Sequence, residues 1–410
     1  MNKIKPLVYM ALSGGVDSAV SAYLLKKQGY EVRAVFMKNW TGTHLNLAGE
    51  CNWTYERDDA AKVAKHLNIP FEVWDFEREY RRDVVDYFFR EYARGRTPNP
   101  DVRCNQYVKI PLFLKRALKE GADFVATGHY CKKSKILNPK SEINPKSKIQ
   151  NFNYNLLSAV DTNKDQSYFL YTLNQKQLKY LLFPVGEMTK PEVRALAKKI
   201  KLPVAVKPDS VGICFVGEVK MEDFLKTRLP NRPGKILDTK GNVLGDHQGL
   251  HFYTIGQRSG MGLANGPWYV IGRNRRRNEL VVGKLKEQKY LLAKTFTTEK
   301  VHWVAGEAPK LPATFLVRHR YRHPVFSARV SKVGSKLKVV FQKSQRAITP
   351  GQSAVFYSLP FKHSPSEDWG NKKKGESRVA LAKWDKKLDQ NLICLGGAVI
   401  DKVENNKFKW

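Results

Sequence analysis

Cysteine is scarce in this sequence. Only five occur in 410 residues, no two form a C-x-x-C pair, and they stand at Cys51, Cys104, Cys131, Cys214 and Cys394. Zinc ribbons and iron–sulfur sites draw their ligands from such closely spaced pairs, so the spacing argues against both. The odd count and wide spacing also do not resemble a disulfide framework. A reducing cytoplasm is the compartment that we expect.

Long apolar runs are missing as well. No run approaches the ~20 residues of a membrane-spanning helix, and we expect no membrane association. The opening "MNKIKPLVYMALSGG" places lysines before a short apolar stretch, as a signal peptide does. That stretch is too short, however, and a glycine loop follows where a cleavage site should be. We interpret it as a first strand.

Acidic residues are few. The chain has 38 Asp and Glu against 72 Lys and Arg, which gives a net charge of +34. A surplus of this size favours a polyanionic partner, most often nucleic acid. A lysine-rich proteome that keeps its proteins soluble would produce a similar excess, so charge alone supports nucleic acid only modestly.

Strand-like and helix-like segments alternate in the first part of the chain. Apolar runs predict strands over 7–12, 31–37, 71–76 and 123–128, and helical spacing predicts helices after residue 15 and over 56–68 and 105–121. Strands separated by helices imply right-handed crossovers. The fold class predicted is therefore α/β, a doubly wound parallel sheet of Rossmann-like type.

Composition predicts three domains. We expect the sheet domain over 1–210, a small β-rich domain over 211–287 and a C-terminal β-barrel over 288–410. The near-repeat "NPKSEI"–"NPKSKI" has too few apolar residues to pack, so we expect a hairpin insertion at about 132–153. The lysine-rich stretch 363–378 predicts an exposed loop within the barrel. Thr189 and Glu192 have the spacing of a capping box at the start of a helix.

The stretch "SGGVDS", residues 13–18, has the composition of a phosphate loop but lacks its lysine. A glycine turn between a strand and a helix presents unpaired N–H groups and the positive end of the helix dipole. The pattern is neither G-x-x-x-x-G-K-[ST] nor G-x-G-x-x-G. A plain structural turn is an equally common use of Ser-Gly-Gly. Its position after the first buried strand favours function.

Cys104 lies in an unusual setting, "GRTPNPDVRCNQYVK". The prolines and Asn99 force a rigid lead-in, and we expect Cys104 to open the helix that follows. A cysteine at a helix N-terminus has a lowered pKa, and Arg103 beside it would act in the same direction. A lone cysteine is more often a small buried hydrophobe. The polar, turn-rich setting argues against burial here.

Cys214 lies in "KPDSVGICFVGE", on a short apolar stretch between two glycines. This stretch predicts a strand or a loop at a domain junction, and a core strand is the alternative. Two reactive thiols together with a phosphate loop suggest sulfur transfer, in which one cysteine carries a persulfide and the other resolves it. The remaining three cysteines have no comparable context and are expected to be structural or surface thiols.

The loop "SGGVDS" resembles the pyrophosphate loop of the N-type ATP pyrophosphatases. In that family the loop holds the pyrophosphate released when ATP adenylates a substrate oxygen. The lysine of an ordinary P-loop serves the β- and γ-phosphates. Its absence therefore fits attack on the α-phosphate.

Six motifs in order resemble the tRNA-specific 2-thiouridylases: "SGGVDS", "GRTPNP…CN", "TGHY", "KDQSYFL", "GICFVGE" and "GLHFYTIGQR". The match spans roughly residues 7–285, and the barrel fits more loosely through "TPGQSAVFY". Three departures are the "NPKS" repeat, an added loop in the barrel and Pro111, which stands where the family usually has glycine and could bend the helix after Cys104.

The resemblance implies a cytoplasmic, ATP-dependent tRNA sulfurtransferase. ATP, with Mg²⁺ beside it, would adenylate the 2-carbonyl oxygen of the wobble uridine, and a persulfide would displace AMP to leave 2-thiouridine. By the match Cys214 carries the persulfide, Cys104 frees the sulfur, and Asp101 orients or exchanges a proton near the base. The two cysteines end as a disulfide or return to thiols. A persulfide donor protein, either a cysteine desulfurase or a sulfur relay protein, is implied.

The resemblance also implies the binding residues. Ligands of open α/β sheets bind at the carboxyl ends of strands, which fits the nucleotide positions. ATP is expected at Ala11, Leu12, Ser13, Gly14, Gly15, Val16, Asp17, Ser18, Met37 and Gly128. Transfer RNA is expected at Asn99, Pro100, Asp101, His129, Lys164, Asp165, Gln166, Arg320, Tyr321 and Gln352. The basic "RNRRRN", 273–278, is either a further phosphate contact or a solvated turn.

Two other functions stay open. Synthesis of lysidine in tRNA, or of an amide from an activated carboxylate, uses the same adenylation but needs no paired thiols. A basic RNA-binding protein with a decayed loop belongs to another class. Against the latter, the loop keeps both glycines, both serines and Asp17.

Overall fold

The computed structural model describes residues 5–41, 53–136, 153–209, 221–359 and 391–404. Cys51, Cys214, the "NPKS" repeat and the lysine-rich stretch 363–378 lie outside these residues. Within them no helix is both long and apolar enough to cross a membrane.

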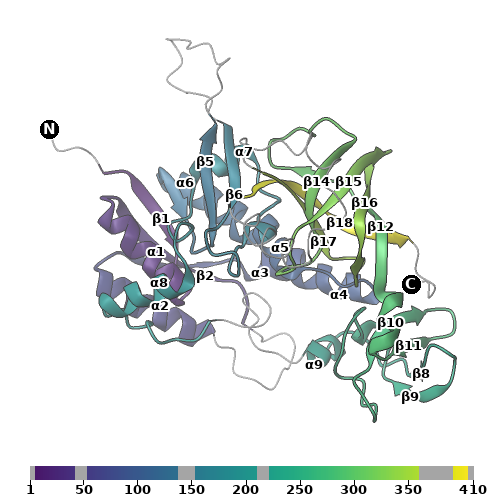
Figure 1. Cartoon of the computed structure of the whole chain (residues 1–410). Helices are drawn as coiled ribbons and strands as arrows, with labels where there is room; N and C mark the ends of the chain where they lie inside the picture. The colour runs from purple at the N-terminus through teal and green to yellow at the C-terminus, as the bar shows by residue number, and fades with distance from the viewer. Residues whose placement is uncertain (1–4, 42–52, 137–152, 210–220, 360–390, 405–410) are drawn as a thin grey trace.

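A five-stranded parallel sheet forms the N-terminal part, in the order β3-β2-β1-β4-β7. The chain runs outward from β1 on one side and then crosses to β4 on the other, so the order reverses beside β1. This confirms the predicted α/β class and the doubly wound arrangement (Figure 1). The strands are β1 (Leu7–Ala11), β2 (Glu31–Lys38), β3 (Phe71–Asp75), β4 (Phe124–Ala126) and β7 (Leu181–Leu182).

Helices cover both faces of this sheet because successive side chains of its strands point to opposite faces. Val8 and Met10 pack into one core with α1, α2 and α8, whereas Tyr9 packs into the other with the remaining helices. The first group is α1 (Val16–Lys27), α2 (Trp53–Leu67) and α8 (Lys190–Lys199). The second includes α3 (Glu77–Tyr80), α4 (Asp86–Ala93), α6 (Pro111–Lys119) and α7 (Gln175–Tyr180).

Two helical runs on the second face each contain a π-helical turn. The first is α3, η1 (Arg81–Val85) and α4, and the second is α5 (Pro100–Cys104), η2 (Asn105–Lys109) and α6. The predicted helix over 105–121 is therefore real but begins five residues earlier, at Pro100. Its π turn directly follows Cys104 and ends just before Pro111, where the N–H of a regular helix would be lost.

A hairpin joins the sheet domain to the barrel. β5 (Cys131–Ile136) and β6 (Asn153–Ser158) pair antiparallel, and β6 pairs in turn with β18 of the barrel. Of the insertion predicted at about 132–153, residues 132–136 and 153 belong to these two strands, and the rest lies outside the described residues. The short η3 (Ser167–Phe169) follows this hairpin.

A small four-stranded sheet comes next, in the order β10-β11-β8-β9. Only the β8–β11 pair is parallel. Its elements are α9 (Met221–Lys226), β8 (Gly234–Leu237), β9 (Val243–His247), η4 (Leu250–Phe252), β10 (Tyr269–Asn274) and β11 (Glu279–Gly283).

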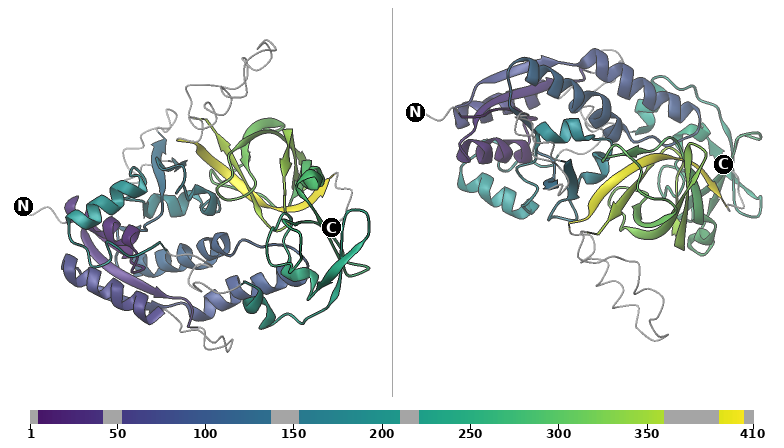
Figure 2. Two further views of the ribbon diagram at one scale, coloured as in Figure 1. Left: turned by 60° about the horizontal axis from the view of Figure 1, so that its bottom comes forward. Right: turned by 90° about the horizontal axis from the view of Figure 1, so that it is seen from above.

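The C-terminal strands close into a six-stranded barrel, because β12 pairs with both β16 and β18. Phe296, Phe341 and Phe356 fill its interior. Figure 2 shows the barrel and the small sheet on the side of the molecule opposite the N-terminal strand. The elements are η5 (Leu285–Leu291), β12 (Leu292–Thr298), β13 (His302–Trp303), β14 (Ala313–Arg318), β15 (Phe326–Val333), β16 (Lys336–Arg346), β17 (Ser353–Ser358) and β18 (Ile393–Glu404).

Candidate functional site

The "SGGVDS" loop connects β1 to α1 at the carboxyl edge of the parallel sheet. The backbone N–H of Ser13 donates to the Ser18 hydroxyl at 3.2 Å, and that hydroxyl donates to the Gly15 carbonyl at 3.0 Å. Ser18 therefore ties the two ends of the loop together. The loop precedes α1, whose 12 residues place the positive end of a helix dipole at the turn.

Two glycines allow this loop to pack closely against its neighbours. Gly14 has φ +73°, and a Cβ there would lie 2.3 Å from the carbonyl oxygen of Glu56 in α2. A Cβ on Gly128, which follows β4, would lie 2.8 Å from the backbone nitrogen of Ser18. The residues expected at ATP, 11–18 and Gly128, thus adjoin one another at the point where the strand order reverses. Met37 lies near the carboxyl end of the adjacent β2, with its side chain buried.

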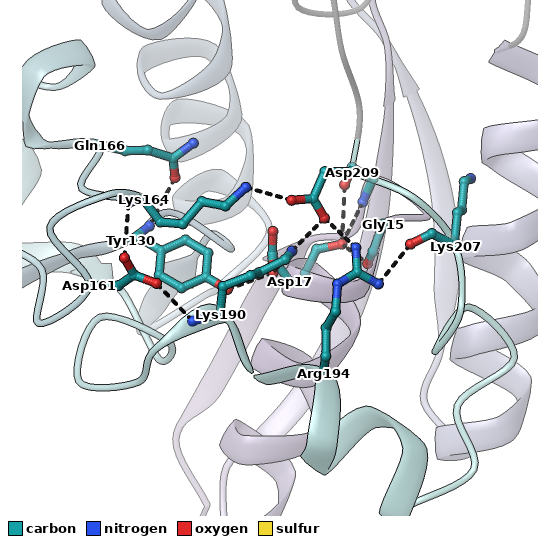
Figure 3. Close-up of polar contacts among 12 residues, drawn as sticks. Gly15, Asp17, Tyr130, Asp161, Lys164, Gln166, Lys190, Arg194, Lys207 and Asp209 are labelled. Carbon is teal, nitrogen blue, oxygen red and sulfur yellow. Dashed lines mark hydrogen bonds and ion pairs between the residues drawn. The ribbon is translucent and has the colours of Figure 1, made fainter. Parts of the chain in front are cut away.

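Charged side chains surround Asp17 of the loop (Figure 3). The Lys190 ammonium group lies 2.6 Å from the Asp17 carboxylate, and the Tyr130 hydroxyl donates to the same oxygen at 2.8 Å. Lys190 also pairs with Asp209 at 2.8 Å. The carboxylate of Asp209 accepts further from Lys164 and Arg194, each at 2.5 Å. Burial works to raise the pKa of Asp209, but its ion pairs, above all those with Lys164 and Lys190, outweigh burial and lower that pKa strongly.

Lys190, Arg194 and Asp209 are not among the residues predicted from the sequence. Their only local signal was the capping box that begins α8, where the Glu192 carboxylate accepts from the backbone N–H of Thr189 at 2.7 Å, as predicted. Asp161 accepts the backbone N–H of Lys190 at 2.9 Å and so fixes the same helix start.

Cys104 is buried, with 1% of its surface exposed, and it belongs to the same apolar cluster as Tyr168 and Phe169. It also does not open its helix. Asn99 is the N-cap, its side chain accepting from Val102 N–H at 3.1 Å, and Pro100 is the first helical residue. The predicted exposed cysteine at a helix start is therefore wrong on both counts. The cause is tertiary, because the helix of Cys104 packs against η3 of the "KDQSYFL" segment and Cys104 joins the apolar cluster that includes Tyr168 and Phe169.

Arg103 does not extend freely beside the thiol. Its guanidinium stacks between the rings of Tyr87 and Tyr107, 4.1 and 4.0 Å from their centroids. These cation–π contacts hold Arg103 between α4 and η2.

The segment that precedes Cys104 is held by the other two domains. Gln352 of the barrel donates to the carbonyls of Thr97 and Pro98 at 3.0 and 3.2 Å, and Pro350 accepts the Thr97 N–H at 3.0 Å. The Thr97 hydroxyl also meets that of Thr254 in the central domain at 3.1 Å. Gln352, expected at tRNA, thus lies beside the Asn99–Asp101 stretch expected there too.

Arg96 adds an ion-pair network to this contact. Its guanidinium forms ion pairs with Glu91 of α4 at 2.8 Å and with Glu299, just past β12 of the barrel, at 2.6 Å. The backbone on both sides of Thr97 is therefore fixed before the helix of Cys104 begins.

Several of the residues expected at tRNA are buried or already hydrogen-bonded. His129 is buried, and its Nδ1 meets the Thr127 hydroxyl at 2.8 Å. Burial, reinforced by nearby Lys109, lowers the pKa of His129 well below its usual value. The Gln166 side chain accepts the backbone N–H of Tyr130 at 2.9 Å. Lys164 is half-buried in its pair with Asp209.

Asp165 is the most deeply buried of the expected tRNA residues. Its carboxylate pairs with Arg318 of the barrel at 2.9 Å, and the two side chains are 1% and 4% exposed. It also accepts the N–H and the hydroxyl of Ser167. Asp165 therefore ties the sheet domain to the barrel.

Arg320 and Tyr321 lie on the barrel beside the same segment. The Tyr321 ring is 4.3 Å from that of Phe169, and Arg320 is close enough to Tyr168 to influence its pKa. The structure thus brings together Arg320, Tyr321, η3 and, through η3, the helix of Cys104.

The basic cluster 273–278 is the β10–β11 turn, and its members differ. Arg273 is buried and donates to the carbonyls of Tyr253 and Gly95 at 3.0 and 2.8 Å. The neighbouring Arg275 donates to the carbonyl of Arg94. Arg276 and Arg277 are exposed. Arg273 therefore holds two domains together, and only the exposed tip remains for a phosphate contact.

The π turn after Cys104 approaches the phosphate loop. Lys109, its last residue, is close enough to influence the pKa of both His129 and Glu56. The backbone of Glu56 touches Gly14 and His129 follows Gly128, so the helix of Cys104 and the loop border the same region.

Two of the remaining cysteines fit the expected structural role. Cys131 and Cys394 are buried free thiols, and burial raises the pKa of each. Among the described residues no group of three or more His, Cys, Asp or Glu side chains is arranged to hold a metal ion.

Three family models match the chain between residues 6 and 359. Residues 6–218 match the model described as "tRNA methyl transferase HUP domain", 222–284 the "tRNA methyl transferase PRC-barrel domain", and 293–359 the "Aminomethyltransferase beta-barrel domain".

Individual relatives are similar over most of their length. The tRNA-specific 2-thiouridylase MnmA of Streptococcus mutans is 42% identical over 86% of this chain and 92% of its own. That of Geobacillus thermodenitrificans is 42% identical over 86% and 91%. Among solved structures, a 4-thiouridine synthetase–RNA complex with bound ATP shares 14% identity over 54% of this chain and 50% of that one, with a TM-score of 0.30, which is too low to support an inference.

Proposed function

This chain belongs to the family of tRNA-specific 2-thiouridylases, and we propose that it uses ATP to replace the 2-oxygen of the wobble uridine of tRNA with sulfur. Membership makes it an enzyme, a tRNA sulfurtransferase. The proposal depends mainly on one observation: the phosphate loop and the helical run of Cys104 border the same region. A loop suited to pyrophosphate lies at the carboxyl edge of the sheet. Lys109, in the helical run of Cys104, lies near enough for its charge to act on His129 and Glu56, which adjoin that loop.

The first step is adenylation. The 2-carbonyl oxygen of uridine attacks the α-phosphate of ATP, the bond to the β-phosphate breaks, and pyrophosphate leaves. The close packing at Gly14 and Gly128 supports this role, because it fixes the loop and the N-terminus of α1 before ATP binds. Their backbone N–H groups are then already placed to donate hydrogen bonds to an anion. Residues 11–18, Met37 and Gly128 are the proposed contacts, and Mg²⁺ would accompany the nucleotide.

The second step transfers sulfur. The terminal sulfur of a Cys214 persulfide attacks C2 of the adenylated base and AMP departs. The Cys104 thiolate then attacks the Sγ of Cys214, which leaves sulfur on the base and a Cys104–Cys214 disulfide; an external thiol reduces that disulfide. Cys214 lies outside the described residues. Asp101, three residues before Cys104, is the proposed orienting or proton-exchanging group.

Transfer RNA is proposed to bind where the barrel meets the segment before Cys104. Gln352, Arg320 and Tyr321 support this by lying next to that segment or to η3. The target base must leave the anticodon stack to react. Because Cys104 and His129 are buried, the region has to open for substrate, and that opening is part of the proposal. A persulfide donor protein and the reducing cytoplasm complete the reaction.

The test is tRNA-dependent release of pyrophosphate combined with mass spectrometry of the wobble nucleoside. We expect release only when ATP and tRNA are both present, and 2-thiouridine when a persulfide donor is added. A pure RNA-binding protein would release none. A lysidine or amide synthetase would release pyrophosphate with its own acceptor but form no thionucleoside.

A further inference from the structure

A lysine from a distant helix reaches the loop that has none of its own. Lys190 is the first residue of α8, and its side chain is only 10% exposed. Its ammonium group is held between the carboxylates of Asp17 and Asp209, at 2.6 and 2.8 Å. Because α8 packs directly against α1, the helix that the loop begins, the fold fixes this lysine beside the loop.

Cations surround the Asp209 carboxylate in the way that they would surround a bound anion. Its two carboxylate oxygens accept from Lys190 and Arg194, which lie one turn apart on α8, and from Lys164, which comes from a separate segment. Figure 3 shows Asp209 beside the loop, between Lys164 and Arg194. Three cations around one carboxylate are more than a single ion pair requires.

A phosphate chain fits this environment better than a carboxylate does. Pyrophosphate carries more negative charge and more acceptor oxygens, and charge-assisted hydrogen bonds to lysine and arginine are among the strongest in proteins. The Asp17 carboxylate would continue to position Lys190, supported by the hydroxyl of Tyr130.

We propose that Lys190, with Arg194, supplies the phosphate-binding charge that an ordinary P-loop carries within the loop, and that Asp209 occupies the pyrophosphate position when no nucleotide is bound. Binding of the polyphosphate then displaces the Asp209 carboxylate from these cations. The inference rests on the proposed function, since it deepens the ATP site by naming its cations and their competing anion.

The two roles predict substitutions of opposite sign. Lys190→Met removes a phosphate ligand and should weaken pyrophosphate binding by about tenfold or more. Asp209→Asn removes the competitor and should strengthen binding by about threefold or more, because apparent affinity rises with the fraction of free sites. Lys190→Arg should keep most of the affinity.

The experiment titrates inorganic pyrophosphate with Mg²⁺ into the full-length chain by calorimetry. The matched control is Lys207→Met, which removes one positive charge of the same region. The Lys207 ammonium pairs with Asp59 at 2.8 Å. Its contact with Arg194 is made by the backbone carbonyl, which the substitution keeps. Circular dichroism and thermal unfolding establish that each variant is folded.

Weaker binding in Lys190→Met, tighter binding in Asp209→Asn and unchanged binding in Lys207→Met support the inference. Equal losses in Lys190→Met and Lys207→Met would reduce it to a general charge effect and overturn it. Weaker binding in Asp209→Asn would show that Asp209 only holds the cations in place and would overturn its role as a competitor. If the wild type releases pyrophosphate with tRNA but Lys190→Met binds pyrophosphate as tightly as the wild type, this inference is contradicted and the proposed function stands.

Discussion

Substitution of Gly128 by alanine tests the geometry of the phosphate loop. The new Cβ would lie 2.8 Å from the Ser18 nitrogen and 3.0 Å from the carbonyl carbon of Asp17, both of them backbone atoms. Because ordinary contacts begin near 3.4 Å, the first turn of α1 must move by about 0.6 Å. Overpacking of this kind costs about 1–3 kcal/mol of stability. A displacement approaching 1 Å at a binding site can cost about 100-fold in rate, so we expect kcat/KM for ATP to fall about 10- to 100-fold.

The assay is tRNA-dependent pyrophosphate release at varied ATP, with the free energy of unfolding measured in urea. The matched control is Gly245→Ala in β9, whose new Cβ would meet only the flexible Leu263 side chain, at 3.2 Å. We expect that control to keep its kcat/KM for ATP. If Gly128→Ala keeps kcat/KM within about twofold of the wild type, the loop does not hold the phosphates in the way described here.

The remaining predictions concern the domain contacts, proton uptake and tRNA. Arg318→Met leaves Asp165 buried without its partner and should lower the free energy of unfolding by about 3–5 kcal/mol, measured in urea. Gly351→Ala combines a φ of +95° with a Cβ 2.8 Å from the Thr97 backbone, so thiolation should fall, as nucleoside mass spectrometry would detect. Burial lowers the pKa of His319 to about 3. The contribution of His319 to stability is therefore fully present above the unfolded pKa of 6.5 and is lost as the pH falls toward 3. Between about pH 7.5 and about pH 5 the wild type should lose about 2 kcal/mol of unfolding free energy that His319→Phe keeps. Affinity for tRNA should fall at least about tenfold between about 50 and about 200 mM salt in a filter-binding assay, and flat binding would contradict a phosphate-dominated contact.

The sheet, its order of elements and the phosphate loop could be predicted from the sequence because their signals are local. Buried parallel strands appear as continuous apolar runs, and the glycines of the loop follow the first of them directly. The sequence also contains a local signal for the true start of the helix of Cys104. Asn is a common N-cap and proline a common first helical residue, and Asn99 and Pro100 take these two positions.

The burial of Cys104 and the charges at the loop could not be predicted in this way. Tyr168 and Phe169, in the same apolar cluster as Cys104, come from more than sixty positions along the chain. Lys190, which pairs with Asp209, reaches Asp17 from farther still. Arg273 is a further example. A run of arginines predicts an exposed basic turn, yet Arg273 itself is buried and donates to carbonyls of two domains. Contacts of this kind depend on how elements pack and leave no mark on the local pattern.

Adenylation and sulfur transfer are separate steps of the proposed reaction, and one enzyme performs both. The most direct measurement compares Cys104→Ser and Cys214→Ser with the wild type, following pyrophosphate release and 2-thiouridine in the same reaction, with Cys131→Ala as a control for a buried thiol outside the site. We predict that both serine variants still release pyrophosphate with tRNA but form no 2-thiouridine, and that Cys131→Ala forms it. Formation of 2-thiouridine by both serine variants would contradict the account.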